Sequence, residues 1–291
     1  MPNVHATPNI RRRRLGEALR RYRNEAKLSL DQAAELMGGS WDAPKLSRIE
    51  TAKGKVSARD AAVLLGHYGI ADEEVVTALE SLARDAGKTG WWSVYGDVVG
   101  QALQDLISSQ SDAEGIRQYQ PNVIPGLLQI GAYAREITTA TSFHRSADDH
   151  AATAEVRIAR QSILTRPGKP VKYWVVIHEA LLYQRFVSHP SLMREQLRHL
   201  LDMGDLPNVT IQVMPLTAGP HPGASGNFAI TQFQRPWPTL VSVEHRGEIR
   251  YREGDDEARL FGDAFDQIVA AALPADRSRE TIRNHMEGHG S

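Results

Sequence analysis

Residues 29–55, SLDQAAELMGGSWDAPKLSRIETAKGK, contain two short helical patterns separated by a glycine turn. Ser29 can cap the first helix, and the pair Gly38-Gly39 ends it. Asp42 can cap the second helix, where Pro44 is tolerated in the first turn. The apolar residues that would face a preceding helix are Ala33, Ala34, Met37, Trp41, Leu46 and Ile49. Two such helices with a tight turn between them predict a helix-turn-helix unit.

The second helix of this unit would project its outer face into the major groove of DNA. The residues on or beside that face are Ala43, Pro44, Lys45, Ser47 and Arg48. Lys and Arg side chains can read the guanine edge, whereas Ser is less selective. Phosphate contacts are expected from Lys53, Lys55 and the run Arg11–Arg14, which includes Arg12 and Arg13. The alternative is a plain helical bundle whose basic faces are only solvated.

Further helical patterns flank the unit on both sides. One begins at Leu15, a second runs from Ser57 to Gly69, and a third runs from Asp72 to about Gly87. We therefore predict a five-helix domain over residues 15–87. Residues 1–14 are expected to be a flexible basic tail.

The string Lys45-Leu46-Ser47-Arg48-Ile49-Glu50-Thr51 resembles the recognition helix of the Xre/phage-repressor type of helix-turn-helix domain. The resemblance implies five helices, DNA binding and, often, a homodimer on a two-fold operator. It also implies that Glu50 is structural. Two features depart from the family pattern: the turn Gly38–Trp41 is about two residues longer than usual, and Ala52 replaces the customary glycine. Both leave open the angle of the recognition helix and which side chains reach bases.

Charge is distributed unevenly along the 291 residues, although the net charge is only -1. Residues 1–60 hold 13 Lys+Arg and 7 Asp+Glu, which gives +6, and the remainder holds 21 and 28, which gives -7. A basic N-terminal part on an acidic body is expected if only the first part meets a polyanion. Cysteine is absent, and the chain contains no long apolar run. We expect no signal peptide, because no apolar stretch adjoins the basic residues near the N-terminus. We expect a cytoplasmic protein of two domains.

Residues 88–291 combine helical and strand patterns, which predict an α+β domain with a mixed or antiparallel sheet. The expected helices are 91–109, a segment ending near 138, 151–164, 192–203 and 257–272. The expected strands are 171–177, 209–214, 227–233 and a hairpin of 240–244 with 248–252 around Arg246-Gly247. No strand is expected before residue 171.

Several strings in this region resemble one family. They include Trp91-Trp92, Pro125-Gly126-Leu127-Leu128-Gln129, Arg157 through Arg160-Gln161, His178-Glu179-Ala180-Leu181 and Gln212-Val213-Met214-Pro215. Together they resemble the antitoxin-like C-terminal domain of the actinobacterial Xre regulators of development, the WhiJ-like regulators. The resemblance implies transcriptional control and a small partner protein encoded nearby.

Five residues are candidates for binding such a partner or a ligand: Trp91, Trp92, Gln129, Arg157 and Arg160. Each also has a structural interpretation. The two tryptophans can anchor one domain on another, and Pro125–Gln129 can simply shape a turn. The two arginines can form ordinary ion pairs on a solvated helix face.

An enzyme is not predicted. His178-Glu179 begins like a zinc-protease motif, but residue 182 is Leu where the second histidine would stand. His221 has no acidic residue near it in sequence, and neither a metal nor a cofactor is expected. Two alternatives to a partner-responsive regulator stay open. One is a hydrolase that uses His178, Glu179 and His221, and the other is an antitoxin that mainly sequesters its partner and regulates its own gene.

Overall fold

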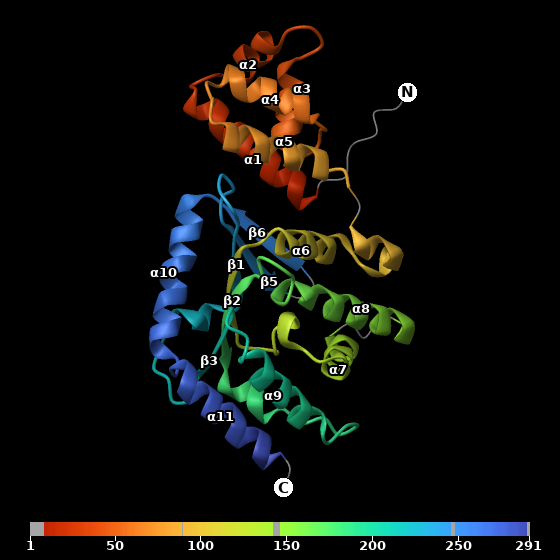
Figure 1. Ribbon diagram of the computed structural model, residues 1–291, viewed down its shortest axis with the longest axis vertical. Coiled ribbons are helices and arrows are strands. Elements are labelled where there is room, and N and C mark those ends of the chain that lie inside the picture. The colour runs from red at the N-terminus through yellow and green to blue at the C-terminus, as the bar shows by residue number, and fades with distance from the viewer. Residues whose placement is uncertain (1–8, 89, 142–145, 246–247, 290–291) are drawn as a thin grey trace. The chain divides into compact units, whose positions relative to one another are not determined.

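The computed structural model describes residues 9–88, 90–141, 146–245 and 248–289 (Figure 1). The chain forms two compact units, each built from separate stretches of sequence. The first unit, called here the helical unit, contains the residues up to Val94, Gln101–Ser109 and Gln234–Pro238. The second, called the sheet unit, contains Tyr95–Gly100, Gln110–Phe233 and the residues from Thr239 onward.

The helical unit contains the five predicted helices. They are α1 (Ile10–Glu25), α2 (Leu30–Met37), α3 (Ala43–Glu50), α4 (Ala58–His67) and α5 (Glu73–Asp85). Their shared core includes Leu19, Leu46, Leu64, Leu65 and Leu79, all fully buried. The capping residues predicted for α2, α3 and α5 each accept a backbone N–H, at Ser29, Asp42 and Asp72.

The start of α1 differs from the prediction. Ile10–Arg14 were expected in a flexible tail, but they form the first turns of the helix. The Asn9 side chain caps this helix by accepting from the Arg12 N–H at 2.9 Å. Ile10 is fully buried, and Arg14 is only 2% exposed. The tail prediction was wrong for these residues because four consecutive arginines hide the apolar spacing on which it relied. The tail's residues 1–8 lie outside the described part of the chain.

The sheet unit is built on a mixed six-stranded sheet of order β3-β2-β1-β4-β5-β6. The strands are β1 (Gly115–Gln120), β2 (Lys172–His178), β3 (Val209–Met214), β4 (Phe228–Gln232), β5 (Leu240–His245) and β6 (Glu248–Glu253). β1, β2 and β3 are parallel, while β4, β5 and β6 are antiparallel to their neighbours. The predicted α+β class and the mixed sheet are confirmed. The predicted turn Arg246-Gly247 lies outside the described residues.

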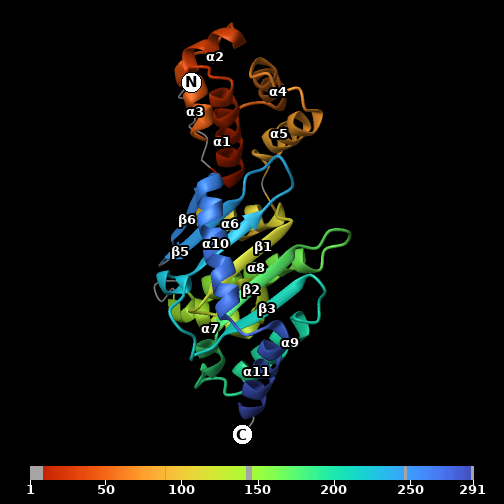
Figure 2. The same cartoon turned by 90° about the vertical axis from the view of Figure 1, so that its left-hand side faces the viewer.

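Helices cover both faces of this sheet (Figures 1 and 2). On one face lies α10 (Asp255–Ala271), whose Phe265 and Ile268 pack on Tyr119 and Val176. The other face packs against α7 (Gly131–Thr141), α9 (Leu192–Met203) and α11 (Ala275–Gly288) in a larger core. The remaining α-helices are α6 (Gln101–Ser111) and α8 (Ala147–Ala159). The 3₁₀ helices are η1 (Trp91–Val98), η2 (Gly126–Leu128), η3 (Arg160–Leu164), η4 (Glu179–Tyr183) and η5 (Pro222–Ser225).

One strand and one α-helix of the sheet unit were not predicted. Strand β1, GIRQYQ, lies centrally, yet three of its six residues are Arg or Gln. Those side chains obscure the apolar pattern that normally indicates a buried strand. Helix α11 was missed because charged residues dominate its sequence, although Ser278 and Ile282 are buried. The segment 91–109, predicted as one helix, is the 3₁₀ helix η1 followed by α6. Among the described helices, none combines the length and apolar content that crossing a membrane requires.

Candidate functional site

Helix α3 has one buried face and one accessible face. Asp42 starts the helix by accepting the Lys45 N–H at 2.6 Å. Leu46 and Ile49 are buried in the core of the helical unit. The opposite face leaves Pro44 and Arg48 exposed, while Ala43, Lys45 and Ser47 are partly exposed. All five DNA-binding residues predicted for this helix therefore lie on or beside one accessible helix face.

The turn before α3 uses two glycines in the left-handed region, with φ of 63° at Gly38 and 61° at Gly39. Side chains rarely adopt this conformation, so the turn depends on glycine at both positions. The lengthened turn also brings Trp41 beside the helix, where the Lys45 Nζ lies 4.0 Å from the Trp41 ring centroid. This cation–π contact gives Lys45 a partner within the protein. Arg48 is the more exposed of the two cations on the helix.

A buried ion pair ties α3 to α1. The Arg23 Nε and Nη2 donate to the two carboxylate oxygens of Glu50 at 2.6 and 2.8 Å. Both residues are buried, at 8% and 7% exposure. Hydrogen bonding to Glu50 raises the pKa of Arg23 above its ordinary value. The structural role implied for Glu50 is confirmed, because its carboxylate fixes the last turn of α3 rather than facing DNA.

Close backbone contact between α1 and α3 depends on Gly16, a residue that the sequence analysis did not single out. A Cβ at this position would lie 2.6 Å from the Ile49 carbonyl oxygen and 2.7 Å from that of Glu50. Only glycine allows this approach. A glycine inside an otherwise helical pattern was the available signal.

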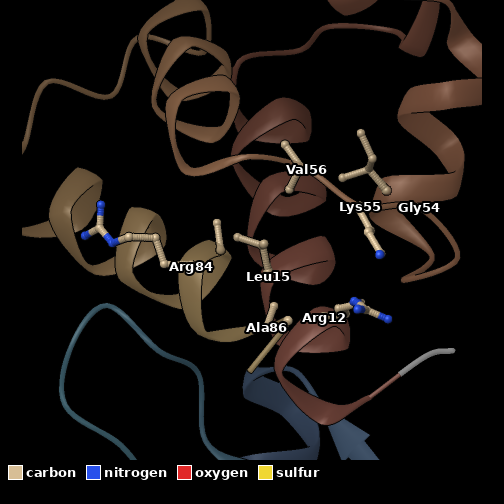
Figure 3. A pocket seen from close by; sticks show the side chains of 10 residues that line it. Arg12, Leu15, Gly54, Lys55, Val56, Arg84 and Ala86 are labelled. Atoms are coloured by element: carbon tan, nitrogen blue, oxygen red, sulfur yellow. The ribbon is translucent and has the colours of Figure 1, made fainter. Parts of the chain in front are cut away.

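The loop after α3 carries the predicted phosphate contacts Lys53 and Lys55, both exposed. A pocket of about 170 Å³ brings Lys55 together with Arg12 of α1, as Figure 3 shows, while Arg84 of α5 extends away from them. Arg13 is exposed as well. Arg14 differs, because it is buried and its guanidinium lies 5.1 Å from the Trp237 ring centroid. Helix α1 therefore leaves Arg12 and Arg13 accessible and buries Arg14.

The candidate partner-binding residues fall into both units. Trp91 and Trp92 belong to the helical unit, with their rings in an edge-to-face arrangement at 5.9 Å. Trp92 is 6% exposed and Trp91 is 42% exposed. Gln129, Arg157 and Arg160 belong to the sheet unit.

Gln129 is only 1% exposed and forms part of a hydrogen-bonded turn. Its Nε2 donates to the Ile124 carbonyl oxygen at 2.7 Å, and its own carbonyl oxygen accepts from the Gln161 Nε2 at 2.7 Å. Its Oε1 faces the Arg157 Nη1 at 3.4 Å. Gln129 therefore acts from inside the fold, where it positions Arg157, and Gln161 is a second positioning residue that sequence reasoning missed.

The three residues of the hydrolase alternative each accept a hydrogen bond from a backbone N–H group. The His178 Nδ1 accepts the Ala180 N–H at 3.2 Å, and the His221 Nδ1 accepts the Gly223 N–H at 3.1 Å. The Glu179 Oε2 accepts the Leu216 N–H at 2.8 Å. Burial and the neighbouring His178 lower the pKa of His221. Within the described ranges, no group of three or more His, Asp or Glu residues is arranged to hold a metal ion.

The five-helix unit with its accessible α3 face defines a DNA-binding protein of the helix-turn-helix class. In agreement, the family model described as "Helix-turn-helix domain" matches residues 14–79. A second family model, described as "Domain of unknown function (DUF5753)", matches residues 103–284, and the chain belongs to this family. No curated protein and no solved structure matches the chain.

Proposed function

We propose that this protein is a sequence-specific transcriptional regulator that reads operator DNA with α3. The observation that carries the proposal is the accessible face of α3, where Arg48 and Ser47 lie opposite the buried Leu46 and Ile49. Arg48 is the principal base-reading residue, because Lys45 is held partly on Trp41. Ala43 and Pro44 contact the groove beside them.

Phosphate contacts in this proposal come from Lys53, Lys55, Arg12 and Arg13. Lys55 and Arg12 come from different elements but line one pocket, so a single phosphate group can meet both. The protein acts in the cytoplasm as a homodimer, and its two copies of α3 occupy the two halves of a two-fold operator.

The DUF5753 domain, in this proposal, binds a small partner protein or a ligand that changes operator affinity, as in antitoxin-like and WhiJ-like regulators. It is not an enzyme, and it uses no metal or cofactor. The coupling must be reciprocal: an effector that weakens DNA binding is itself bound more weakly by the DNA complex. Trp91, which is 42% exposed, remains a candidate partner contact within the helical unit, whereas Trp92 is buried there.

Fluorescence anisotropy tests the DNA proposal, with DNA from the region upstream of the protein's own gene and a scrambled duplex of equal length. We expect tighter binding to the upstream DNA. Arg48→Ala should weaken that binding by about 1–3 kcal/mol and relax the preference at one base pair. Lys45→Ala should cost less, because Trp41 already competes for the lysine.

Lys88→Ala is the control, since Lys88 is exposed, is already paired with Asp85 and does not line the pocket of Arg12 and Lys55. Equal losses on both duplexes for Arg48→Ala would make Arg48 a phosphate contact and contradict its base-reading role. Weak binding of the wild type to both duplexes, together with capture of a small protein encoded nearby, would favour the antitoxin alternative.

A further inference from the structure

One face of the sheet changes from apolar to polar across its width. Residues paired directly across neighbouring strands point to the same face of a sheet. Val175 on β2, Gln118 on β1 and Ala229 on β4 therefore lie on one face. The row continues from Ala229 to Ser242 and from Ser242 to Tyr251. We call Gln118, Ser242 and Tyr251 the polar row. Val175 belongs to the large apolar core, whereas the polar row supplies amide and hydroxyl groups.

Arg160 places a guanidinium close to this polar row. It is the first residue of η3 and is only 7% exposed. Its Nε is buried without a hydrogen-bond partner, and no ion pair joins Arg160 to any described residue. A Cβ on Gly126 would lie 2.1 Å from the Arg160 Nη2, so the guanidinium rests against a backbone position where only glycine fits. Buried polar groups are normally satisfied, so a buried arginine whose Nε has no hydrogen-bond partner needs an explanation.

A second arginine adds positive charge to the same place. Arg157 lies one helical turn before Arg160, and its Nη1 donates to the Gln129 Oε1 at 3.4 Å. The charged and titratable side chains that act on Arg160 are Arg157, Glu244, Tyr173 and Tyr251. Two arginines therefore face one carboxylate, Glu244, which is exposed and is not within ion-pair distance of either.

The electrostatics agree with this geometry. Burial, together with repulsion from Arg157, lowers the pKa of Arg160 to about 10. Burial also lowers the pKa of Arg157. Tyr173, beneath them on β2, donates its hydroxyl to the Gln118 Oε1 at 2.7 Å, so the floor is already hydrogen-bonded. Among the described residues, no carboxylate lies within ion-pair distance of either guanidinium.

We propose that Arg157 and Arg160 bind the oxyanion group, a carboxylate or a phosphate, of a small molecule above the polar row. Guanidinium groups match both anions with paired N–H donors. Gln129 positions Arg157, and Gly126 leaves room for Arg160. Binding of this oxyanion would identify the chemistry of the effector, and only its effect on DNA binding rests on the function proposed above.

The test uses the full chain in a phosphate-free buffer at constant ionic strength. Inorganic phosphate and succinate are titrated separately, and binding is measured by calorimetry and by the rise in Tm. At least one probe should bind the wild type and raise its Tm, and the probe that does so distinguishes a phosphate from a carboxylate ligand. Arg157→Gln and Arg160→Gln should each lower the affinity by about tenfold or more. Glu244→Gln should increase it, because the competing carboxylate is removed.

Arg194→Gln, at an exposed position on α9, is the control and should bind like the wild type. If Arg160→Gln does not fold, the half-buried Arg157→Gln decides the question. Absence of binding by both probes to the wild type would overturn the proposal, and so would unchanged affinity in Arg157→Gln. This assay contains no DNA, so its result does not depend on operator binding. The oxyanion-binding proposal and the DNA-binding proposal can therefore be contradicted independently.

Discussion

Ala52 follows α3 in a conformation that L side chains rarely adopt, with φ of 61°. Glycine adopts this conformation freely, and the chain needs it here because it turns away from α3 while the Lys53 and Gly54 N–H groups both bond to the Arg48 carbonyl oxygen. We predict that Ala52→Gly stabilises the protein by about 1 kcal/mol. Urea unfolding measures the difference. Ala62→Gly, inside α4, should instead destabilise by about 1 kcal/mol, and equal losses in both variants would contradict the strain at Ala52.

His199 on α9 makes stability depend on pH. Burial lowers its pKa below the ordinary 6.5, although Asp202 partly opposes this, and its Nε2 is buried without a partner. The unfolded chain therefore takes up this proton at a higher pH than the folded chain does. Its contribution to stability is complete above pH 6.5 and is lost as the pH falls toward the folded-state pKa.

Thermal unfolding between pH 5 and 8, a range chosen to span about one unit or more on each side of an ordinary histidine pKa, checks the histidine effect. His199→Gln should lose less stability than the wild type on acidification, by at most about 1.4 kcal/mol for each pH unit. His67→Gln, at an exposed position on α4, should follow the wild-type curve. Parallel curves for His199→Gln and the wild type would exclude this histidine as a source of acid sensitivity.

At the scale of elements, α1 and α3 are held together by the Arg23–Glu50 pair. Glu50→Ala leaves the Arg23 guanidinium buried without its carboxylate, and we predict a loss of about 3–5 kcal/mol in unfolding free energy. The double variant Arg23→Met/Glu50→Leu should recover most of this loss, since it removes both charges. Glu25→Ala breaks only the exposed Arg21–Glu25 pair and should change stability by less than about 0.5 kcal/mol. A similar loss in Glu50→Ala and Glu25→Ala would show that the Arg23–Glu50 pair stabilises the protein no more than a surface ion pair does.

Elements with local signals were predictable from the sequence. Caps at Ser29, Asp42 and Asp72 and the Gly38-Gly39 break place α2, α3 and α5 closely, because a cap acts within a few residues. Strand β1 gave no such signal, since its burial depends on β2 and β4 pairing with it from distant parts of the chain. Gly16 was overlooked for the same reason, as its importance lies in a contact with α3.

The candidate sites follow the same division. The outer face of α3 could be assigned from helical periodicity. For Arg157 and Arg160, the same kind of pattern favours ordinary ion pairs on a solvated helix face and does not indicate a binding site. Two arginines one turn apart on an alanine-rich helix usually lie in solvent. Their burial depends on η2 and on the strands beneath them, and neither is encoded in the local pattern.

At the scale of the whole molecule, charge separates along the chain, with +6 over residues 1–60 and -7 over the rest (13 − 7 and 21 − 28). DNA binding should therefore weaken steeply with salt, since each phosphate contact contributes about 0.9 to the slope of log K against log salt. We predict that Lys55→Ala reduces the magnitude of this slope by about 1 and weakens binding equally on upstream and scrambled DNA.

Lys88→Ala is the control for the salt slope, because Lys88 is exposed and already paired with Asp85 at 2.7 Å. Anisotropy titrations at four or more salt concentrations give the slope for each variant. A Lys55→Ala slope identical to that of the wild type would place Lys55 outside the phosphate contacts.

The helical unit is assembled from stretches that lie far apart in the sequence, which affects when it can be completed during translation. Its α1 begins with the Ile10 N–H bonded to the Asp105 carboxylate at 3.0 Å, and its last stretch, Gln234–Pro238, joins β4 to β5. On the ribosome, the first five helices emerge early, Asp105 follows shortly afterwards, and Gln234–Pro238 emerges only after β1 to β4 have been synthesised. The DNA-reading part is therefore finished late in translation, and a nascent chain that stops before β4 carries α3 on an incomplete support.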